Sequence, residues 1–307
     1  MTNNREADAN AYMEKAHVLA EALPYMKRFS GETFVIKYGG SAMGDKELAR
    51  KFAADVVMLK HVGVNPVVVH GGGPQISAML EKLKIRSSFI DGLRVTDAET
   101  VGIVEMVLCG AINKQIVSDI CAAGGMAIGI SGKDGNLIRA RKLRRTKSDP
   151  DSNIEQILDL GFVGEPQFIC PDILTVLEDT DVIPVIAPIG VGEKGETYNI
   201  NADSAAGAIA AALAASKLIM LTDVPGVLDK DKNLISELDV AETRRLMRNG
   251  TITGGMIPKL ETCMHAVDNF TESAHVVDGR VPHAVLIEVF TERGMGTMMT
   301  QSRGGDN

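Results

Sequence analysis

Short apolar runs rich in β-branched residues alternate along the chain with stretches that are apolar at helical spacing. The runs predict strands at 33–38 (TFVIKY), 65–70 (NPVVVH), 126–130 (MAIGI), 181–189 (DVIPVIAPI), 216–222 (SKLIMLT) and 274–278 (AHVVD). The stretches between them predict helices at 45–61, 74–83, 97–123, 171–178, 202–215, 240–249 and 256–270. Strands separated by helices are typical of an open, mostly parallel α/β sheet covered on both faces, with ligands at the carboxyl ends of its strands.

The middle of the chain departs from this alternation. The segment SSFIDGLRVT at 87–96 predicts a β-hairpin around Asp91-Gly92. Residues 136–168 predict a further antiparallel ribbon with a polar tip, TKSDPDSN. We expect these hairpins to form a lid over the crevice at the strand ends.

The N-terminal residues precede the first strand and are not needed to build the sheet. The segment AYMEKAHVLAEALPYMKRF predicts an appended helix, bent near Pro24. Its apolar residues at three-to-four spacing are Tyr12, Ala16, Leu19, Leu23 and Met26. A helix with such a stripe and no partner within its own domain tends to pack on another subunit, although a flexible tail is the alternative.

Composition and charge narrow the class of protein. Apolar residues make up 45% of 307 residues and the net charge is −8, which argues for solubility and against nucleic-acid or membrane binding. The basic segment at 138–147 is an exception, but it lacks interleaved aromatics, which favours a solvated hairpin. The N-terminus has no apolar signal core and the four cysteines form no CxxC pair. We therefore expect a cytoplasmic protein with reduced cysteines.

Two glycine-rich segments imitate nucleotide-binding motifs. GVGEKG at 190–195 matches G-x-G-x-x-G, but no helix is expected after it, which breaks the dinucleotide fingerprint. GGSAMGDK at 39–46 resembles a P-loop, but Asp45 stands where lysine should be. A carboxylate there would repel a triphosphate.

The segment HGGGPQ, which follows the second predicted strand, indicates an anion-binding loop. Two glycines would suffice for a tight turn, so the third calls for another reason. Gly72 and Gly73 let a ligand approach the backbone closely, and their N–H groups lie at the start of a helix that Pro74 opens.

Lysines follow or enter similar glycine turns. Lys37 lies inside an apolar strand just before Gly39-Gly40, and the flanking TFVI favours a central strand over an exposed edge. In TGGMIPKLE, Lys259 lies in the first turns of a helix behind a glycine pair. Both lysines are suited to phosphate, although a solvated helix lysine is the alternative for Lys259.

The segment NINADSAAG places polar groups at the start of an apolar helix. Asn199, Asn201 and Asp203 alternate, so an extended backbone would point all three in one direction, which exceeds what helix capping requires. The segment LTDVPGVLDKD adds a turn with Asp, Pro and Gly after the fifth predicted strand.

Six ordered motifs, KYGGS, HGGGPQI, GLRVT, NINAD, LTDVPGV and TGGMIPKL, resemble the amino acid kinase family. HGGGPQ, GLRVT and NINAD are similar to its N-acetylglutamate kinases in particular. The resemblance implies the amino acid kinase fold, three-layer α-β-α, with two lobes on one sheet. It divides the chain into an oligomerisation helix (1–28), a lobe for the acyl amino acid (29–214) and a lobe for ATP (215–307).

The resemblance also implies the roles of individual residues. The catalytic set is Lys37, Lys259 and Asp203, with Asp203 orienting both lysines. The substrate set is Gly72, Gly73, Arg94, Asn199 and Asn201, with Arg94 holding the α-carboxylate. The nucleotide set is Gly39, Gly40, Thr222, Asp223, Gly226, Val227 and Met256.

The implied reaction is transfer of the ATP γ-phosphoryl group to the side-chain carboxylate of N-acetyl-L-glutamate, with Mg²⁺ entering with ATP and no metal site on the protein. That carboxylate is ionised at neutral pH, so no general base is needed. Three alternatives remain open: a sister kinase for glutamate, aspartate, carbamate or UMP, a non-catalytic arginine sensor, and a dinucleotide-binding dehydrogenase. An α-carboxylate grip by Arg94 argues against carbamate and UMP.

Regulation is the last expectation from the resemblance. Arginine-inhibited members carry an N-terminal helix that links dimers into a hexamer, and a C-terminal signature that His275, Glu288 and Gly294 match. Glu288 would pair with the guanidinium of L-arginine and Tyr12 would cover it from the helix.

Overall fold

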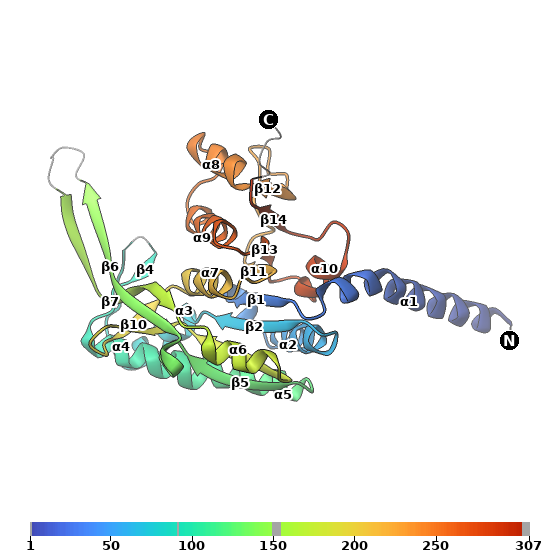
Figure 1. Ribbon diagram of the computed structural model, residues 1–307, viewed down its shortest axis with the longest axis horizontal. Helices are drawn as coiled ribbons and strands as arrows, with labels where there is room; N and C mark the ends of the chain where they lie inside the picture. Colours follow the sequence, from blue (N-terminus) through green and yellow to red (C-terminus); the bar gives the residue numbers. More distant parts are fainter. Residues whose placement is uncertain (1, 91, 149–154, 303–307) are drawn as a thin grey trace.

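The computed structural model describes residues 2–90, 92–148 and 155–302, and its centre is one open sheet (Figure 1). The strands in spatial order are β12 (Glu237–Asp239), β14 (Thr297–Thr300), β13 (Ser273–Asp278), β11 (Lys217–Thr222), β1 (Thr33–Tyr38), β2 (Asn65–His70), β8 (Val182–Ala187) and β5 (Met126–Ser131). Every neighbouring pair is parallel except β13 with β14. The prediction of an open, mostly parallel sheet is confirmed.

Helices cover both faces of this sheet because its central strands are apolar on both sides. Along β1, Phe34 and Ile36 enter one hydrophobic core and Val35 enters the other. The first core is closed by α2 (Lys46–His61), α3 (Gly73–Lys82), α5 (Asn113–Ala122) and α10 (Ala284–Phe290). The second is closed by α6 (Asp172–Glu178), α7 (Ala202–Ala212), α8 (Val240–Arg248) and α9 (Met256–Asp268).

The helix predicted at 97–123 is present and has an irregular centre. It consists of α4 (Ala98–Glu105), a π-helical segment (Met106–Ile112) and α5. Ala98–Ala122 is also long and apolar enough to cross a membrane. Half of its most apolar window is buried inside the protein, as in a core helix, so this is weak evidence for a membrane span.

A smaller closed barrel is built from β6 (Ile138–Ser148), β7 (Glu155–Ile169), β9 (Ile189–Val191) and β10 (Thr197–Ile200). β6 and β7 form the predicted antiparallel ribbon, of whose polar tip residues 149–154 lie outside the described residues. Arg141 pairs with Glu165 and Lys142 with Asp159, so acidic residues of β7 offset part of the basic segment. The expected hairpin at 87–96 is also present, as β3 (Phe89–Ile90) and β4 (Leu93–Arg94).

The N-terminal helix α1 (Thr2–Phe29) extends away from the body of the protein (Figure 1). It runs through Pro24 as one element and is anchored at its base, where the Phe29 ring packs edge-on against Phe34 at 5.3 Å. Along it, Tyr12, Leu19 and Leu23 are each more than 60% exposed. The predicted apolar stripe therefore lies in solvent in a single chain.

Four elements were not expected from the sequence: β10 in the barrel, and β12, β14 and α10 at the periphery. The run DVIPVIAPI also divides, because β8 ends at Ala187 and β9 begins two residues later in the barrel. Two short 3₁₀ helices, Gly40–Met43 and Asp134–Asn136, complete the described elements.

Candidate active site

The glycine loops after β1 and β2 lie side by side because the two strands end in register. Tyr38 is opposite His70 in the parallel pair, and the backbone N–H of Gly71 donates to the carbonyl of Tyr38 at 2.8 Å. β11 ends at the same edge, with Met220 opposite Lys37. The structure thus brings three motifs, KYGGS, HGGGPQ and LTDVPGV, to one edge of the sheet.

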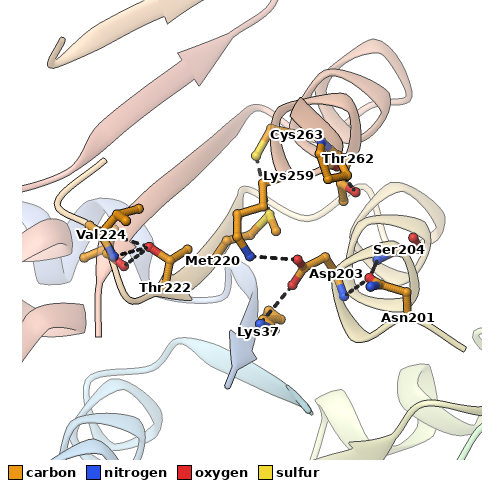
Figure 2. Close-up of polar contacts among 12 residues, drawn as sticks. Lys37, Asn201, Asp203, Ser204, Met220, Thr222, Val224, Lys259, Thr262 and Cys263 are labelled. Carbon is orange, nitrogen blue, oxygen red and sulfur yellow. Dashed lines mark hydrogen bonds and ion pairs between the residues drawn. The ribbon is translucent and has the colours of Figure 1, made fainter. Parts of the chain in front are cut away.

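Asp203 lies between Lys37 and Lys259 (Figure 2). The Nζ of Lys37 is 2.9 Å from Oδ1 of Asp203, and the Nζ of Lys259 donates to Oδ2 at 3.0 Å. The three groups come from β1, α7 and α9. Lys37 is in a central strand and only 8% exposed, as the flanking apolar residues predict.

Lys37 and Lys259 keep the carboxyl group of Asp203 ionised. Burial alone would raise the pKa of its carboxyl, but the ammonium groups of Lys37 and Lys259 outweigh that effect and lower the pKa below its ordinary value. Asp203 therefore remains ionised and keeps both ammonium groups at the end of β1.

A cavity of about 200 Å³ lies beside this cluster. Its walls include Gly72 and Gly73 of the glycine loop, Arg94 of the β3–β4 hairpin, and Asn199 and Asn201. A Cβ at Gly72 would lie 2.7 Å from Leu108 Cδ2 and closer still to Ile112, so a side chain there would force these neighbours to move. Glycine keeps the backbone of the loop at the cavity wall.

Arg94 is buried in the wall of this cavity, at 6% exposure. Its guanidinium donates to the carbonyl of Gly73 at 3.1 Å, to Ser77 Oγ at 2.7 Å and to Ser87 Oγ. It also lies 4.5 Å from the centre of the Phe89 ring. No carboxylate among the described residues pairs with it, so a buried cation here is suited to an anionic ligand.

The two asparagines have different surroundings. Asn199 Nδ2 donates weakly to Thr96 Oγ1 at 3.4 Å. Asn201 is the N-cap of α7 and its Oδ1 accepts from the N–H groups of Asp203 and Ser204 at 2.8 and 3.1 Å. The expectation that 199, 201 and 203 alternate along one extended segment is wrong, because β10 ends at Ile200 and Asp203 belongs to the helix.

Gly39, Gly40 and Asp223 lie together on the other side of Lys37. A Cβ at Gly39 would come within 2.7 Å of Lys37 Nζ, and one at Gly40 would collide with the carboxylate of Asp223. Gly40 also has a positive φ of 75°. These positions need glycine because the backbone passes directly over charged groups.

The remaining residues of the expected nucleotide set make hydrogen bonds or packing contacts within the chain. Thr222 Oγ1 donates to the carbonyl of Val224 at 3.0 Å and closes the turn after β11 (Figure 2). Val227 is buried, and its N–H donates to Thr297 Oγ1 at 2.8 Å. Gly226 has no room for a Cβ, which would lie 2.6 Å from Thr297 Oγ1. Met256 opens α9 and is half-buried against the second core.

His275, Glu288 and Gly294 form a second cluster at the base of α1. Glu288 Oε1 lies 2.6 Å from His275 Nδ1, and Oε2 accepts from the N–H groups of Met295 and Gly296 at 2.7 and 3.0 Å. A Cβ at Gly294 would lie 2.6 Å from Oε2. Glu288 is thus bonded through both oxygens within the chain, and its pairing with a guanidinium stays a prediction.

Tyr12 does not lie at this cluster within one chain. It is 17 residues before Phe29 on a continuous helix, which places it about 25 Å away along the helix axis. Within one chain Tyr12 therefore does not lie beside Glu288, and its role in covering a ligand from the helix stays a prediction. Lys217, which the sequence reasoning missed, is the cation that does lie there, 3.2 Å from His275 Nε2 and 5.1 Å from the Phe29 ring.

The sequence reasoning also missed Ser77, Ser87 and Phe89, the partners of Arg94. Serine hydroxyls on a helix or in a loop usually face solvent, and nothing in the spacing of Ser77 and Ser87 indicates that they contact Arg94.

The two segments that imitate nucleotide-binding motifs, GVGEKG and GGSAMGDK, form neither a dinucleotide-binding fingerprint nor a P-loop, as expected. GVGEKG ends β9 and begins the turn that leads to β10. Asp45 is the N-cap of α2, accepting from the N–H of Glu47 at 2.8 Å.

Among the described residues, no group of three or more His, Cys, Asp or Glu side chains could hold a metal ion. Mg²⁺ keeps several waters and is usually bound by one or two carboxylates together with substrate phosphates. The donor set at the lysine cluster, a single carboxylate already paired with two ammonium groups, fits a metal that arrives on a nucleotide.

Comparison with known proteins agrees with this arrangement. Acetylglutamate kinase from Rhodospirillum rubrum is 66% identical over 292 residues, covering 95% of this chain and 94% of the relative. The enzyme of the same name from Rhodospirillum centenum is 62% identical over 94% of both chains. N-acetylglutamate synthase from Neisseria gonorrhoeae, complexed with coenzyme A and N-acetyl-glutamate, has a TM-score of 0.80 at 22% identity.

The synthase likeness covers 94% of this chain, which spans 64% of the synthase, and it shows the fold alone. The model of the amino acid kinase family matches residues 32–278, a span that contains both lysines, Asp203 and the glycine loops. The chain belongs to the amino acid kinase family.

Proposed function

We propose that this chain is an N-acetyl-L-glutamate 5-kinase, which converts ATP and N-acetyl-L-glutamate to ADP and N-acetyl-L-glutamyl 5-phosphate in arginine biosynthesis. The observation that carries the proposal is Asp203 paired with Lys37 and Lys259, beside a cavity that contains a buried arginine without a carboxylate partner among the described residues. The two acetylglutamate kinases above, similar over nearly their whole length, support it.

The chemistry follows from the charges. The side-chain carboxylate of the substrate is ionised at neutral pH and attacks the γ-phosphorus, while the bond from that phosphorus to the β,γ-bridging oxygen breaks and ADP leaves with the electron pair. The barrier is the approach of an anion to a polyanion. Lys37 stabilises the charge of the transferring phosphoryl group. Lys259 stabilises the charge on the β,γ side of the nucleotide, and Asp203 holds both ammonium groups in place.

Arg94 and the glycine loop position the acceptor. The guanidinium can grip the α-carboxylate through two parallel N–H bonds, which a lysine cannot do, if Nη2 gives up one of its present acceptors, the Gly73 carbonyl or Ser77 Oγ. Ser77 and Ser87 orient it beforehand. Gly72, Gly73, Asn199 and Asn201 line the rest of the acceptor cavity.

The nucleotide belongs on the opposite side of Lys37, next to Gly39, Gly40 and Asp223. The lobe for the acyl amino acid is residues 29–214 and the lobe for ATP is residues 215–307, with one sheet running through both. Mg²⁺ enters with ATP and supplies neutralisation of phosphate charge. The proposed location is the cytoplasm.

The test is ADP release with ATP and Mg²⁺ in the presence of N-acetyl-L-glutamate, L-glutamate or L-aspartate. Turnover should depend on the acetylated substrate. Equal turnover with unacetylated glutamate would favour a glutamate kinase, and no turnover with any of the three would favour a sensor role.

We also propose feedback inhibition by L-arginine in a hexamer made of three dimers. The exposed stripe on α1 supports a contact between subunits, and Glu288 with Lys217 at the root of α1 supports a ligand site joined to that helix. L-arginine would replace His275 and the N–H groups of Met295 and Gly296 as the hydrogen-bond partner of Glu288. Sigmoidal inhibition that raises the apparent KM for the acyl amino acid is the expected result, and activity indifferent to millimolar arginine would contradict it.

A further inference from the structure

His70 is fully buried directly before the glycine loop, and no step proposed above uses it. Its Nδ1 lies 2.8 Å from the carbonyl oxygen of Gly71, and its Nε2 lies 3.3 Å from Asn113 Nδ2. Asn113 follows the π-helical segment and is 1% exposed.

The orientation of the Asn113 amide is fixed by backbone groups. Its Nδ2 donates to the carbonyl of Val185 on β8 at 2.9 Å and to that of Ile130 on β5 at 3.3 Å, while its Oδ1 accepts from Lys114 Nζ at 3.2 Å. Carbonyl oxygens can only accept, so the atom that faces them must be the NH₂ group.

The tautomer of His70 follows from that orientation. The two hydrogens of that NH₂ group have three acceptors within reach, the two carbonyls and His70 Nε2, and are shared among them. An N–H on Nε2 would face this donor, whereas Nδ1 faces the Gly71 carbonyl, which can only accept, so the proton lies on Nδ1. Burial lowers the pKa of His70 to about 4, so the ring is neutral in the physiological range. The Nδ1–H form is the one tautomer that satisfies both neighbours.

This hydrogen bond fixes the direction of the next N–H group. A trans peptide is planar, with its C=O and N–H pointing in opposite directions. The Gly71 carbonyl points to His70, so the Gly72 N–H in the same peptide points away from it. That N–H has no acceptor among the described residues, and Gly72 lines the cavity beside Arg94.

The other side of the loop is held by packing. Gly71 N–H is bound to Tyr38, and Leu108 and Ile112 of the π-helical segment fill the space where a side chain of Gly72 would lie. The π segment thus supplies both the apolar wall behind Gly72 and, through the next residue, the amide that sets the His70 tautomer.

We propose that His70 is a positioning residue for phosphoryl transfer: its Nδ1–H tautomer, set by Asn113, holds the Gly71–Gly72 peptide so that the Gly72 N–H is presented to the anion in the cavity. This inference rests on the proposed kinase activity. It predicts that activity depends on a donor at the Nδ1 position rather than on an imidazole as such.

Two substitutions separate that donor from simple filling of space. In His70→Asn, the amide NH₂ occupies the position of Nδ1 and can still donate to Gly71. In His70→Gln, the longer side chain places its amide near the position of Nε2, where it satisfies Asn113 but not Gly71. We expect His70→Gln to lower kcat/KM for N-acetyl-L-glutamate by about 10- to 100-fold, and His70→Asn to retain most of it.

The thermal midpoint of each variant is measured alongside, with Ile120→Val as a control that removes a core methyl group beside Gly125. A purely structural role would make both histidine variants lose stability while kcat/KM per folded enzyme stays normal, and that result would overturn the proposal. Absence of acetylglutamate-dependent turnover in the unaltered protein would instead overturn the proposed function.

The tautomer is tested independently of activity. A two-bond ¹⁵N–¹H correlation spectrum of the ¹⁵N-histidine-labelled protein at about pH 7 distinguishes the two neutral forms, and the His70→Asn spectrum assigns the signal. We expect a neutral Nδ1–H ring for His70. An Nε2–H ring, or a charged one, would overturn the proposal even if the kinetics agreed.

Discussion

Lys37 and Asp203 form an ion pair of 2.9 Å that joins the central strand of the sheet to the first turn of α7. The same carboxylate reaches Lys259 at 3.0 Å, so one anion holds two cations that would otherwise repel each other. Both ammonium groups are therefore in place before a nucleotide arrives, which is the preorganisation that charge stabilisation requires.

Replacing either lysine tests this arrangement. Lys37→Ala and Lys259→Ala should each lower kcat by roughly a hundredfold or more, the usual effect of losing one preorganised donor. Steady-state ADP release measures the effect, with Lys82→Ala on the exposed side of α3 as the matched control. A near-normal kcat for Lys37→Ala would contradict its role in the transition state.

Asp203→Asn keeps the size of the side chain and removes its charge. We expect kcat to fall sharply while circular dichroism shows an intact fold. The folded pKa of Asp203 lies below the ordinary value of 3.8, so the stability that its ion pairs contribute is present at neutral pH and is lost as the pH falls through that lower pKa. The stability difference between the two proteins should shrink over that acidic range, and an unchanged kcat would reduce Asp203 to a structural residue.

Arg94→Lys should raise the KM for N-acetyl-L-glutamate more than it lowers kcat. The lysine keeps the charge but loses the bidentate grip and the two hydroxyl contacts that orient the guanidinium. Kinetics with the acyl amino acid varied at saturating ATP measure the effect, and Arg86→Lys on the exposed preceding loop is the control. An equal effect of both substitutions would argue against a carboxylate at Arg94.

Deleting residues 1–28 should leave an active, smaller assembly with a weaker response to arginine. The double substitution Leu19→Ser with Leu23→Ser should reproduce that effect, because both side chains lie in solvent on the apolar stripe. Multi-angle light scattering gives the mass, and Glu21→Gln on the opposite side of the helix is the control. A hexamer that survives the deletion would show that α1 does not link the dimers.

His283 and Asp55 predict a pH dependence of stability. They lie 2.6 Å apart and join α2 to the segment that opens α10. Burial raises the pKa of Asp55 to about 6 although His283 opposes it, so its contribution to stability is full below about pH 4 and is lost as the pH rises through about 6.

The Asp55→Asn variant should therefore gain stability relative to the unaltered protein by roughly 2 to 3 kcal/mol between those limits. Urea unfolding at several pH values measures the difference. A difference that does not change with pH would mean that Asp55 titrates normally.

The central part of the fold was predictable from local pattern. β1, β2, β8, β11 and β13 are apolar runs that are buried on both faces, so composition alone marks them. β12 and β14 were missed because ELD and TMMT are short, half-polar and at one edge, where burial no longer selects apolar residues. The π segment was invisible because it changes the turn of the helix and not its apolar composition.

The charged centre of the site was also predictable, since a lysine in a buried strand or an aspartate at a helix start is unusual in itself. The residues that hold Arg94 and His70 in place could not be predicted. Ser77 and Ser87 reach Arg94 only because the β3–β4 hairpin folds over α3, and the Asn113 contact to His70 joins segments that no local pattern connects. Asn201 lines the cavity and also caps α7, a second role that its place in the motif does not reveal.

The projecting helix α1 also has a mechanical consequence. At 28 residues it is about 42 Å long, and it meets the body of the protein at Phe29, whose ring lies against Phe34 and 5.1 Å from Lys217 Nζ. A tilt of about 10° at that pivot would sweep the free end through about 7 Å. If α1 moves as one rigid body, a rearrangement of one side chain at this pivot would therefore be enlarged into a movement of several ångströms at the free end of the helix.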